Sequence, residues 1–217
     1  MRMGRPKKTE QGPVSTKERI FQKALELFAA RGYDAVSVRD ITRALNLNEA
    51  SLYNHYKNKS ALLHVILERL QNNLIDPGFR VPPVEMFVSA GEFDAAEYLI
   101  EGAKRFFGRT DRDTLLTWRM LMISQFCYEE ARLTIEEQLL DAPTRFLTAL
   151  LENMQAAGRI PGNVDCRSGG RILSALFFDY SFRANLKAAW DEQSDEEFSR
   201  LKEDLRSIAN WLHASNG

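Results

Sequence analysis

Apolar residues recur three and four positions apart along most of the chain, which is the spacing of helices that bury one face. No segment shows the sustained alternation of apolar and polar residues that a half-buried strand needs. The pattern therefore predicts an all-α protein, with a small N-terminal bundle on a larger C-terminal one. The predicted helices span about 15–32, 37–45, 48–56, 58–75, 94–107, 111–128, 130–157, 166–189 and 195–214.

Signals for helix starts and turns are clearest near the N-terminus. Ser37 and Asp40 stand three positions apart, which is the pattern of a capping box. Asn46 is one of the few non-glycine residues that tolerates positive φ, so it can supply the turn before the next helix. The short helices 37–45 and 48–56 then have the dimensions of a helix-turn-helix.

These signals divide the chain into three regions. Residues 1–14 hold two Pro, two Gly and four basic residues without periodicity, which indicates a flexible basic arm. A helix-turn-helix head is expected over 15–64, and a larger helical region over 65–217. Within the latter, the Pro- and Gly-rich stretch 76–92 predicts a loop or boundary.

The composition is that of an ordinary globular protein, with 217 residues, 44% apolar and 27% charged. These fractions exclude collagen-like, wholly disordered and disulfide-scaffold classes. The chain has no run of the ~20 apolar residues that a membrane helix requires, and no signal-peptide core follows its basic start. We therefore expect a cytoplasmic protein without membrane contact, in which Cys127 and Cys166 are reduced.

Charge is distributed unevenly along the chain. Residues 1–64 carry twelve Lys and Arg against six acidic residues, a net charge of +6. Residues 65–217 carry 17 basic and 24 acidic residues, a net charge of −7. This asymmetry favours a head that binds a polyanion, joined to a body with another task.

From Ser37 to Leu63 the sequence reads SVRDITRALNLNEASLYNHYKNKSALL. Its second half, LYNHYKNKSALL, closely resembles the DNA-binding head of TetR-type transcriptional regulators, and the match covers about residues 15–64. The resemblance implies a TetR-like all-α fold whose divergent C-terminal bundle binds a ligand and forms a dimer. In two places the sequence departs from the family pattern, because Asn46 stands where Gly is usual and Tyr56 where an apolar residue is usual.

The end of the second short helix and the start of the next carry groups suited to DNA phosphates. Lys57 and Lys59 flank a helix N-terminus, where free amides favour an anion. Tyr53 and His55 can donate hydrogen bonds to phosphate oxygens. From the residues alone, Tyr53 could instead be a half-buried core tyrosine and His55 an ordinary surface histidine. The two lysines could be a solvated pair. The expected phosphate contacts are Ser37, Tyr53, His55, Lys57 and Lys59.

The resemblance also implies which residues face base edges: Arg39, Glu49, Ala50 and Ser51. We expect Arg39 to discriminate most, because a bidentate contact from Arg to guanine contributes ~1–3 kcal/mol against a wrong base. Tyr56 is interpreted as a core residue whose hydroxyl must find a partner or reach water.

For the N-terminal arm we consider a separate hypothesis, namely a contact with the DNA minor groove. Its Gly-Arg-Pro core is narrow enough to enter an A·T-rich minor groove, with lysines on the flanking phosphates. The expected contacts are Arg5, Lys7 and Lys8. A disordered solubilising tail explains the same composition.

Motifs for enzyme chemistry are absent from the sequence. It contains no GxxxxGK[ST], GxSxG or HExxH pattern, and its three His are too few for a persuasive metal cluster. We therefore expect no catalytic residues, no metal and no cofactor.

The predicted helices of the C-terminal region carry many large apolar residues. Trp118, Met122 and Phe126 at spacings of four, together with Phe106 and Phe146, are candidates for the walls of an effector cavity, and a filled core is the alternative. The resemblance implies that the last two helices meet a twofold copy. If they do, the interface residues are Leu173, Leu176, Phe177, Tyr180, Leu201, Leu205, Ile208 and Trp211. The alternative is that these stripes pack only within the chain.

Taken together, these features predict a transcriptional regulator, most simply a homodimeric repressor that binds a palindromic operator and responds to a small-molecule effector. The alternative is a basic helical interaction or scaffold protein without operator recognition. The two differ in whether binding discriminates between duplexes.

Overall fold

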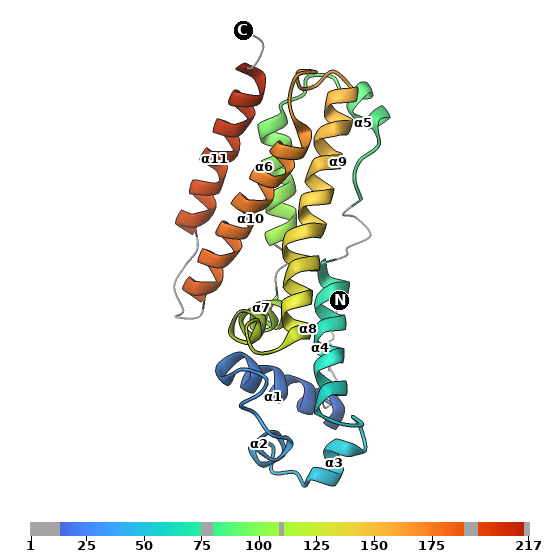
Figure 1. Ribbon diagram of the computed structural model, residues 1–217, viewed down its shortest axis with the longest axis vertical. Coiled ribbons are helices and arrows are strands. Elements are labelled where there is room, and N and C mark those ends of the chain that lie inside the picture. The colour runs from blue at the N-terminus through green and yellow to red at the C-terminus, as the bar shows by residue number, and fades with distance from the viewer. Residues whose placement is uncertain (1–13, 75–79, 109–110, 189–194, 215–217) are drawn as a thin grey trace, which may run out of the picture.

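The computed structural model describes residues 14–74, 80–108, 111–188 and 195–214, and its described residues form helices and connecting loops without a strand. The molecule is elongated, with α1–α3 at one end and α4 leading toward the body (Figure 1). The elements are α1 (Thr16–Arg31), α2 (Val38–Ala44), α3 (Glu49–Tyr53), α4 (Lys59–Leu74), α5 (Val84–Ser89), α6 (Ala95–Phe107), α7 (Arg112–Ser124), α8 (Glu129–Thr134), the π-helix η1 (Ile135–Asp141), α9 (Ala142–Ala156), α10 (Cys166–Ala188) and α11 (Asp195–Ala214). The expected all-α class is confirmed.

The predicted caps of the short helices are present. Ser37 and Asp40 form a reciprocal capping box at the start of α2. Asn46 has φ +54° and makes the turn after it. Asn48 begins α3 by accepting a hydrogen bond from the Ser51 amide at 2.8 Å. Each of these signals depends on residues close together in sequence, and each forms as expected.

Two predicted boundaries were wrong, and one predicted helix contains an irregular segment. α3 ends at Tyr53 rather than near residue 56, because the His55 amide turns back to the Leu52 carbonyl in a tighter turn. The expected loop 76–92 contains α5, whose Phe87 is fully buried. The expected helix 130–157 is one continuous helical run from Glu129 to Ala156, of which Ile135–Asp141, η1, has π-helical hydrogen bonding. Pro143 explains the π segment, since it lacks an amide and its ring clashes with a carbonyl one turn earlier.

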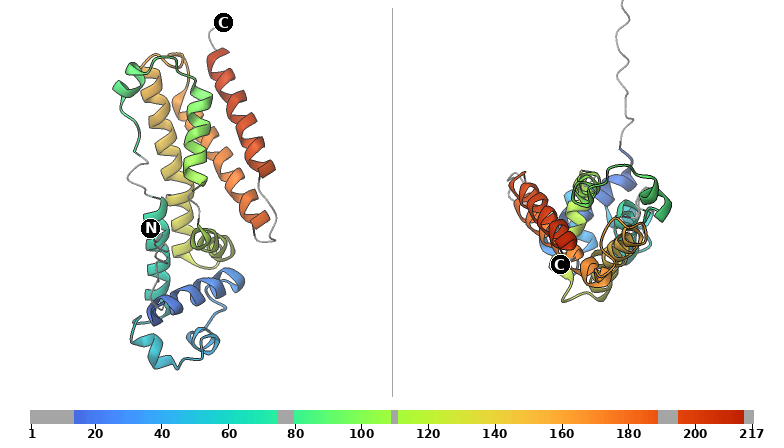
Figure 2. Two further views of the ribbon diagram at one scale, coloured as in Figure 1. Left: turned by 180° about the vertical axis from the view of Figure 1, so that it is seen from behind. Right: turned by 90° about the horizontal axis from the view of Figure 1, so that it is seen from above.

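The chain packs around two cores. The first joins α1–α4 to α7 and α8, so that Met120, Leu121 and Ala131 are buried against residues of the head. The second lies among α5, α6, α9, α10 and α11, with Leu151 and Leu205 completely buried. Figure 2 shows α6, α10 and α11 gathered beside α9, away from the head. The head is therefore packed directly on part of the body.

None of the helices in the described part of the chain combines the length and apolarity needed to cross a membrane.

Candidate nucleic-acid interface

The short helix α3 is anchored on one side and open on the other. Leu52 is completely buried in the first core, while Glu49 and Ala50 are exposed. Tyr53 is 50% exposed, so half of its side chain is accessible to a ligand at this end of the molecule. Because α3 turns one face inward through Leu52, its polar residues form an open surface at the tip of the molecule (Figure 1).

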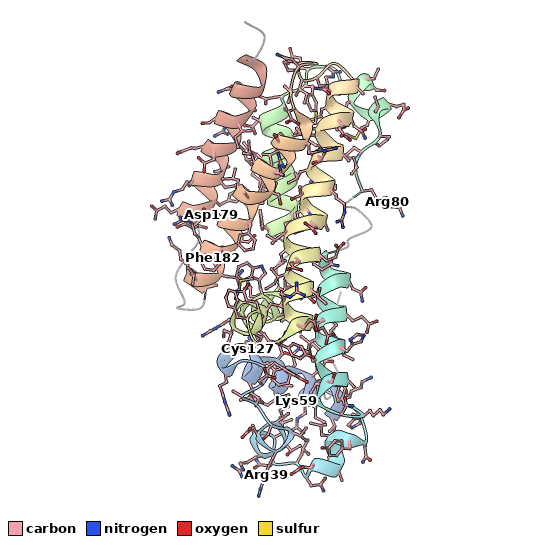
Figure 3. The ribbon with its side chains drawn as sticks, in the orientation of Figure 1. Arg39, Lys59, Arg80, Cys127, Asp179 and Phe182 are labelled. Carbon is pink, nitrogen blue, oxygen red and sulfur yellow. The ribbon has the colours of Figure 1, made fainter. Side chains whose placement is uncertain are left out.

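The residues predicted to face base edges are mostly accessible. Arg39 is exposed on α2 and lies at the end of the molecule (Figure 3). Ser51 differs, since its half-buried hydroxyl donates a hydrogen bond to the Asn48 Oδ1 at 2.8 Å. Three of the four side chains therefore extend from the same tip with nothing covering them, and Ser51 contributes to its own helix cap.

Two of the predicted phosphate contacts, His55 and Lys57, are exposed in the turn between α3 and α4. The hydroxyl of a third, Ser37, donates to Asp40 Oδ2 at 2.6 Å. These hydrogen bonds from Ser37 hold the pKa of the Asp40 carboxyl below its ordinary value, so the cap stays charged. The start of α2 is thus fixed in place, which holds the adjacent Arg39 at the tip.

Lys59 lies in a different environment from Lys57. Its ammonium donates a hydrogen bond to the Tyr33 carbonyl at 2.7 Å and stands 4.0 Å from the centre of the Tyr33 ring. Burial lowers the pKa of Lys59 from its ordinary value. The solvated lysine pair allowed by the sequence is therefore not what the structure shows, because Lys57 is exposed whereas Lys59 is partly buried against Tyr33.

The interpretation of Tyr56 as a core residue is confirmed. Its side chain is 4% exposed, and its hydroxyl donates to the Lys17 carbonyl at 3.3 Å. Burial raises the pKa of Tyr56. The unusual tyrosine thus joins the α3–α4 turn to the start of α1.

One cation at the tip was missed by the sequence analysis. Arg43 is exposed in the last turn of α2, four positions after Arg39. Residues four apart lie on one face of a helix, so this spacing could have identified it as a further candidate phosphate contact. The predicted contacts of the arm, Arg5, Lys7 and Lys8, lie outside the described residues.

The predicted effector-cavity residues do not meet at a common point. α7 ends at Ser124, so Phe126 lies beyond the helix and is 91% exposed. The prediction for Phe126 was wrong, because its alignment with Trp118 required the helix to continue. Met122 packs against the first core, whereas Phe146 packs against the second.

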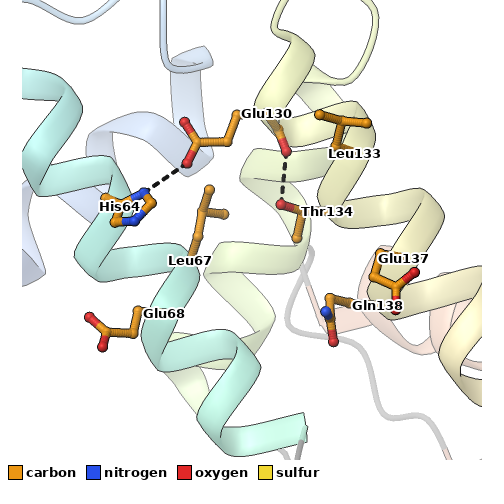
Figure 4. A pocket seen from close by; sticks show the side chains of 8 residues that line it. All are labelled: His64, Leu67, Glu68, Glu130, Leu133, Thr134, Glu137 and Gln138. Carbon is orange, nitrogen blue, oxygen red and sulfur yellow. Dashed lines mark hydrogen bonds and ion pairs between the residues drawn. The ribbon is translucent and has the colours of Figure 1, made fainter.

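A cavity of about 440 Å³ lies elsewhere, between α4 and the α8–η1 segment (Figure 4). Its lining residues are His64, Leu67, Glu68, Glu130, Leu133, Thr134, Glu137 and Gln138, none of which was predicted as a pocket residue. Within it, His64 Nδ1 and Glu130 Oε1 are 3.0 Å apart. Phe106, half-buried, packs edge-on against Phe107 away from this cavity.

The residues predicted for a twofold interface lie mostly inside the chain. Four belong to the second core and are at most 9% exposed: Leu173, Tyr180, Leu201 and Leu205. Three others pack against that core: Leu176, Phe177 and Ile208. The side chain of Trp211 lies outside the described residues. The four buried assignments were wrong, since a helical stripe marks a buried face but does not say what buries it.

The opposite face of α10 carries a different stripe. Its exposed positions follow spacings of three and four: Ile172, Ala175, Asp179, Phe182 and Leu186. The three large apolar members are 45%, 38% and 51% exposed, respectively. This is the seam pattern by which one helix packs along another. Asp179 and Phe182 lie on the outer edge of the body in Figure 3.

The described geometry defines a class, namely a helix-turn-helix head with a short exposed recognition helix on a helical body. The family described as bacterial regulatory proteins, tetR family, matches residues 20–66. The biofilm operon icaADBC HTH-type negative transcriptional regulator IcaR of Staphylococcus epidermidis is 38% identical over 60 residues, covering 28% of this chain and 32% of the relative. The same regulator of Staphylococcus aureus strain Newman is 37% identical over 46 residues, 21% and 25% of the two chains. The chain thus matches about a third or less of the length of these relatives.

Solved structures extend the likeness over the whole fold. The MbdR regulator from Azoarcus sp. CIB aligns with TM-score 0.64 and 15% identity over 88% of this chain and 97% of its own. Salmonella enterica GusR aligns with TM-score 0.60 and 20% identity over 94% and 100%. Residues 20–66 thus match the tetR family of bacterial regulatory proteins, and the fold of the described residues resembles that of these solved regulators.

Proposed function

We propose that this protein is a sequence-specific DNA-binding repressor that acts as a homodimer on a palindromic operator. The observation that carries the proposal is the open tip formed by α2 and α3. Arg39, Glu49, Ala50 and Tyr53 are exposed there on helices whose other faces are buried. Held rigidly in this way, the side chains can enter a major groove while His55, Lys57 and Arg43 reach the flanking phosphates.

The exposed stripe on α10 supports the homodimer. A single five-residue helix offers few base contacts, and a twofold copy doubles them on a palindrome whose half-sites lie ~34 Å or a multiple of it apart. Ile172, Phe182 and Leu186 leave an apolar seam at the periodicity of helix pairing. Asp179 on the same seam pairs with Arg183 at 2.8 Å. The α10 helix of a second protomer that packs across this seam would therefore face both an acidic and a basic side chain.

Ligand responsiveness is the third part of the proposal. The first core joins the head to α7 and α8, so a small molecule that shifts these helices also alters the spacing of the two heads. An effector that prefers the wrongly spaced conformation lowers operator affinity by its differential affinity for the two states, typically ~1–3 kcal/mol. The proposed working parts are thus an arm over residues 1–14, a head over 15–64 and a regulatory body over 65–217.

The deciding experiment is selection of bound duplexes from a random DNA pool with the purified chain. A palindromic consensus supports the proposal, whereas equal recovery of all duplexes shows a non-specific basic protein. Arg39→Ala should relax the preference at one base pair of each half-site, and Tyr53→Phe should weaken binding to all sequences equally. Deletion of residues 1–12 tests the arm, since unchanged affinity and salt dependence exclude its minor-groove contact.

The oligomeric state is tested separately by light scattering. Phe182→Glu places a charge in the α10 seam and should give monomers that do not bind the selected operator. Leu133→Glu is the matched control, because Leu133 is 49% exposed on α8 and lies off the seam. Dimers of the Phe182 variant as stable as those of the control would contradict the assigned interface.

A further inference from the structure

The cavity between α4 and the α8–η1 segment, shown in Figure 4, combines apolar and acidic walls. Two leucines contribute the apolar part, Leu67, which is 4% exposed, and Leu133, which is 49% exposed. The polar lining residues are His64, Glu68, Glu130, Thr134, Glu137 and Gln138. No Lys or Arg is among these described lining residues. The cavity therefore offers an apolar surface beside three carboxylates.

The three carboxylates of the cavity differ in how far their charge is offset. Glu130 Oε1 lies 3.0 Å from His64 Nδ1, so a protonated His64 offsets its charge. Glu137 forms an ion pair with Arg145 at 2.5 Å. Glu68 is exposed on α4 and forms no ion pair with any residue that the structure describes. The negative charge of Glu68 is therefore left for a group from outside the chain.

The spacing and size of the cavity favour an organic cation over a metal ion. A hard metal ion takes several oxygen ligands at about 2.0–2.6 Å. Within the described part of the chain, no three His, Cys, Asp or Glu side chains come together in a way that could hold one. The cavity volume of about 440 Å³ lies within the ~300–1,000 Å³ of small-molecule sites. The walls therefore suit a larger cation that also has an apolar part.

We propose that this cavity binds an amine that carries an apolar segment. The ammonium group is attracted by Glu68, the carboxylate without an ionic partner, and can form charge-assisted hydrogen bonds with it. The apolar segment lies against Leu67 and Leu133 and loses contact with water there. An anion of the same shape is repelled, and a neutral molecule lacks the attraction. The role of the amine as effector rests on the proposed function, whereas its binding is a property of the free protein.

Probes that share a phenylbutyl group separate the effect of charge from that of apolar burial. Phenylbutylamine is a cation at neutral pH, phenylbutanol is neutral and phenylbutyrate is an anion. In isothermal titration calorimetry of the purified chain at low salt, the amine should bind about tenfold more tightly than the alcohol, and the carboxylate should not bind. Equal affinities for amine and alcohol would overturn the proposal. Tighter binding of Ca²⁺ than of the amine would overturn it too, since the site would then be a metal site.

Variants of exposed residues locate the bound amine. Glu68→Gln keeps the side-chain shape and removes the charge, so it should weaken amine binding about tenfold and leave alcohol binding unchanged. Glu129→Gln is the matched control, because Glu129 on α8 has an 80% exposed side chain and does not line the cavity. Leu133→Ser should weaken the amine and the alcohol by the same factor, since it removes apolar surface. Equal losses in Glu68→Gln and Glu129→Gln would show attraction to the overall charge of the body, and would overturn the site.

Operator binding tests the role of the amine separately from its binding. If phenylbutylamine acts as an effector, it should weaken binding of the parent chain to the selected operator, and Glu68→Gln should need about tenfold more amine for the same effect. If the amine binds through Glu68 but leaves operator affinity unchanged, the site stands and the effector role fails. If the random-pool selection yields no preferred duplex, the proposed repressor function fails, while calorimetry still decides whether the cavity binds the amine.

Discussion

Replacing Gly170 by Ala should destabilise the protein, although the same change usually stabilises a helix. Gly170 lies on the side of α10 that packs tightly against Thr148 of α9. A Cβ added there would be 2.2 Å from Thr148 Oγ1, 2.8 Å from Thr148 N and 2.9 Å from Thr148 Cα. The hydroxyl can rotate away, but the backbone atoms cannot, so the two helices must separate.

The magnitude follows from two opposing terms. Overpacking of this kind costs about 1–3 kcal/mol, and backbone contacts place it in the upper half of that range. The better helix propensity of Ala returns about 1 kcal/mol. The net loss is about 1–2 kcal/mol, which for a chain of this length lowers the midpoint of thermal unfolding by about 2–8 °C.

Gly102→Ala is the control within the same protein. Gly102 lies inside α6, and a Cβ there meets no atom within 4 Å. This variant should gain about 1 kcal/mol, because only the propensity term remains. Urea unfolding followed by helical circular dichroism, at one protomer concentration, measures both. The reasoning is refuted if Gly170→Ala is as stable as the parent, or if the two variants shift the midpoint in the same direction.

Three further changes probe other contacts. Arg69 donates two hydrogen bonds to Glu18 and holds its pKa below the ordinary value, so the stabilisation exists above the unfolded pKa and is lost as the pH falls through the folded one. Glu18→Gln should cost no more than ~1 kcal/mol at neutral pH, since the pair is partly exposed, and in acid unfolding curves this cost should shrink as the pH falls below ~4.5. Burial raises the pKa of Tyr128 to about 12, so the stability that its neutral hydroxyl contributes should disappear between pH ~10 and ~12. If the stability of Tyr128→Phe falls equally over that window, Tyr128 is not the group responsible. Asn46→Ala should lose ~1 kcal/mol in urea because φ is +54°, whereas Asn46→Gly should lose nothing.

The helices of the head could be predicted because their limits are local. The capping box of Ser37 with Asp40 and the positive φ of Asn46 each involve residues within a few positions of one another. The interruption at η1 is also local in origin, since Pro143 is visible in the sequence. It was missed because strong apolar periodicity continues on both sides of it.

The faces of the C-terminal helices could not be predicted in the same way. Periodicity shows that Leu173 and Leu205 are buried, but it does not distinguish a core within the chain from an interface with a copy. The exposed seam through Ile172 and Phe182 is interrupted by Asp179, which weakens its signal in the sequence. Only the packing of α10 on α9 shows which stripe is left open.

The candidate DNA surface shows the same division between local and distant contacts. Exposure of Arg39 and Lys57 follows from short helices with one buried face. Lys59 stands only two positions from Lys57, yet its environment depends on Tyr33, which lies 26 positions away. Adjacent cations in one motif can therefore have different roles, and a motif match cannot separate them.

Because the head packs on the body, the boundary near residue 64 in the sequence is not the boundary of a separate folded unit. A break near residue 64 separates a basic motif from an acidic remainder, but Met120 and Leu121 complete the core of the head and are at most 1% exposed. Close-packed interiors transmit displacement because side chains have no space in which to absorb it. A shift of α7 therefore changes the head's own core, and the proposed regulation needs no separate linkage between two independent domains. The proposed DNA-binding unit thus extends in space to α7 and α8, beyond the segment in which its motif lies.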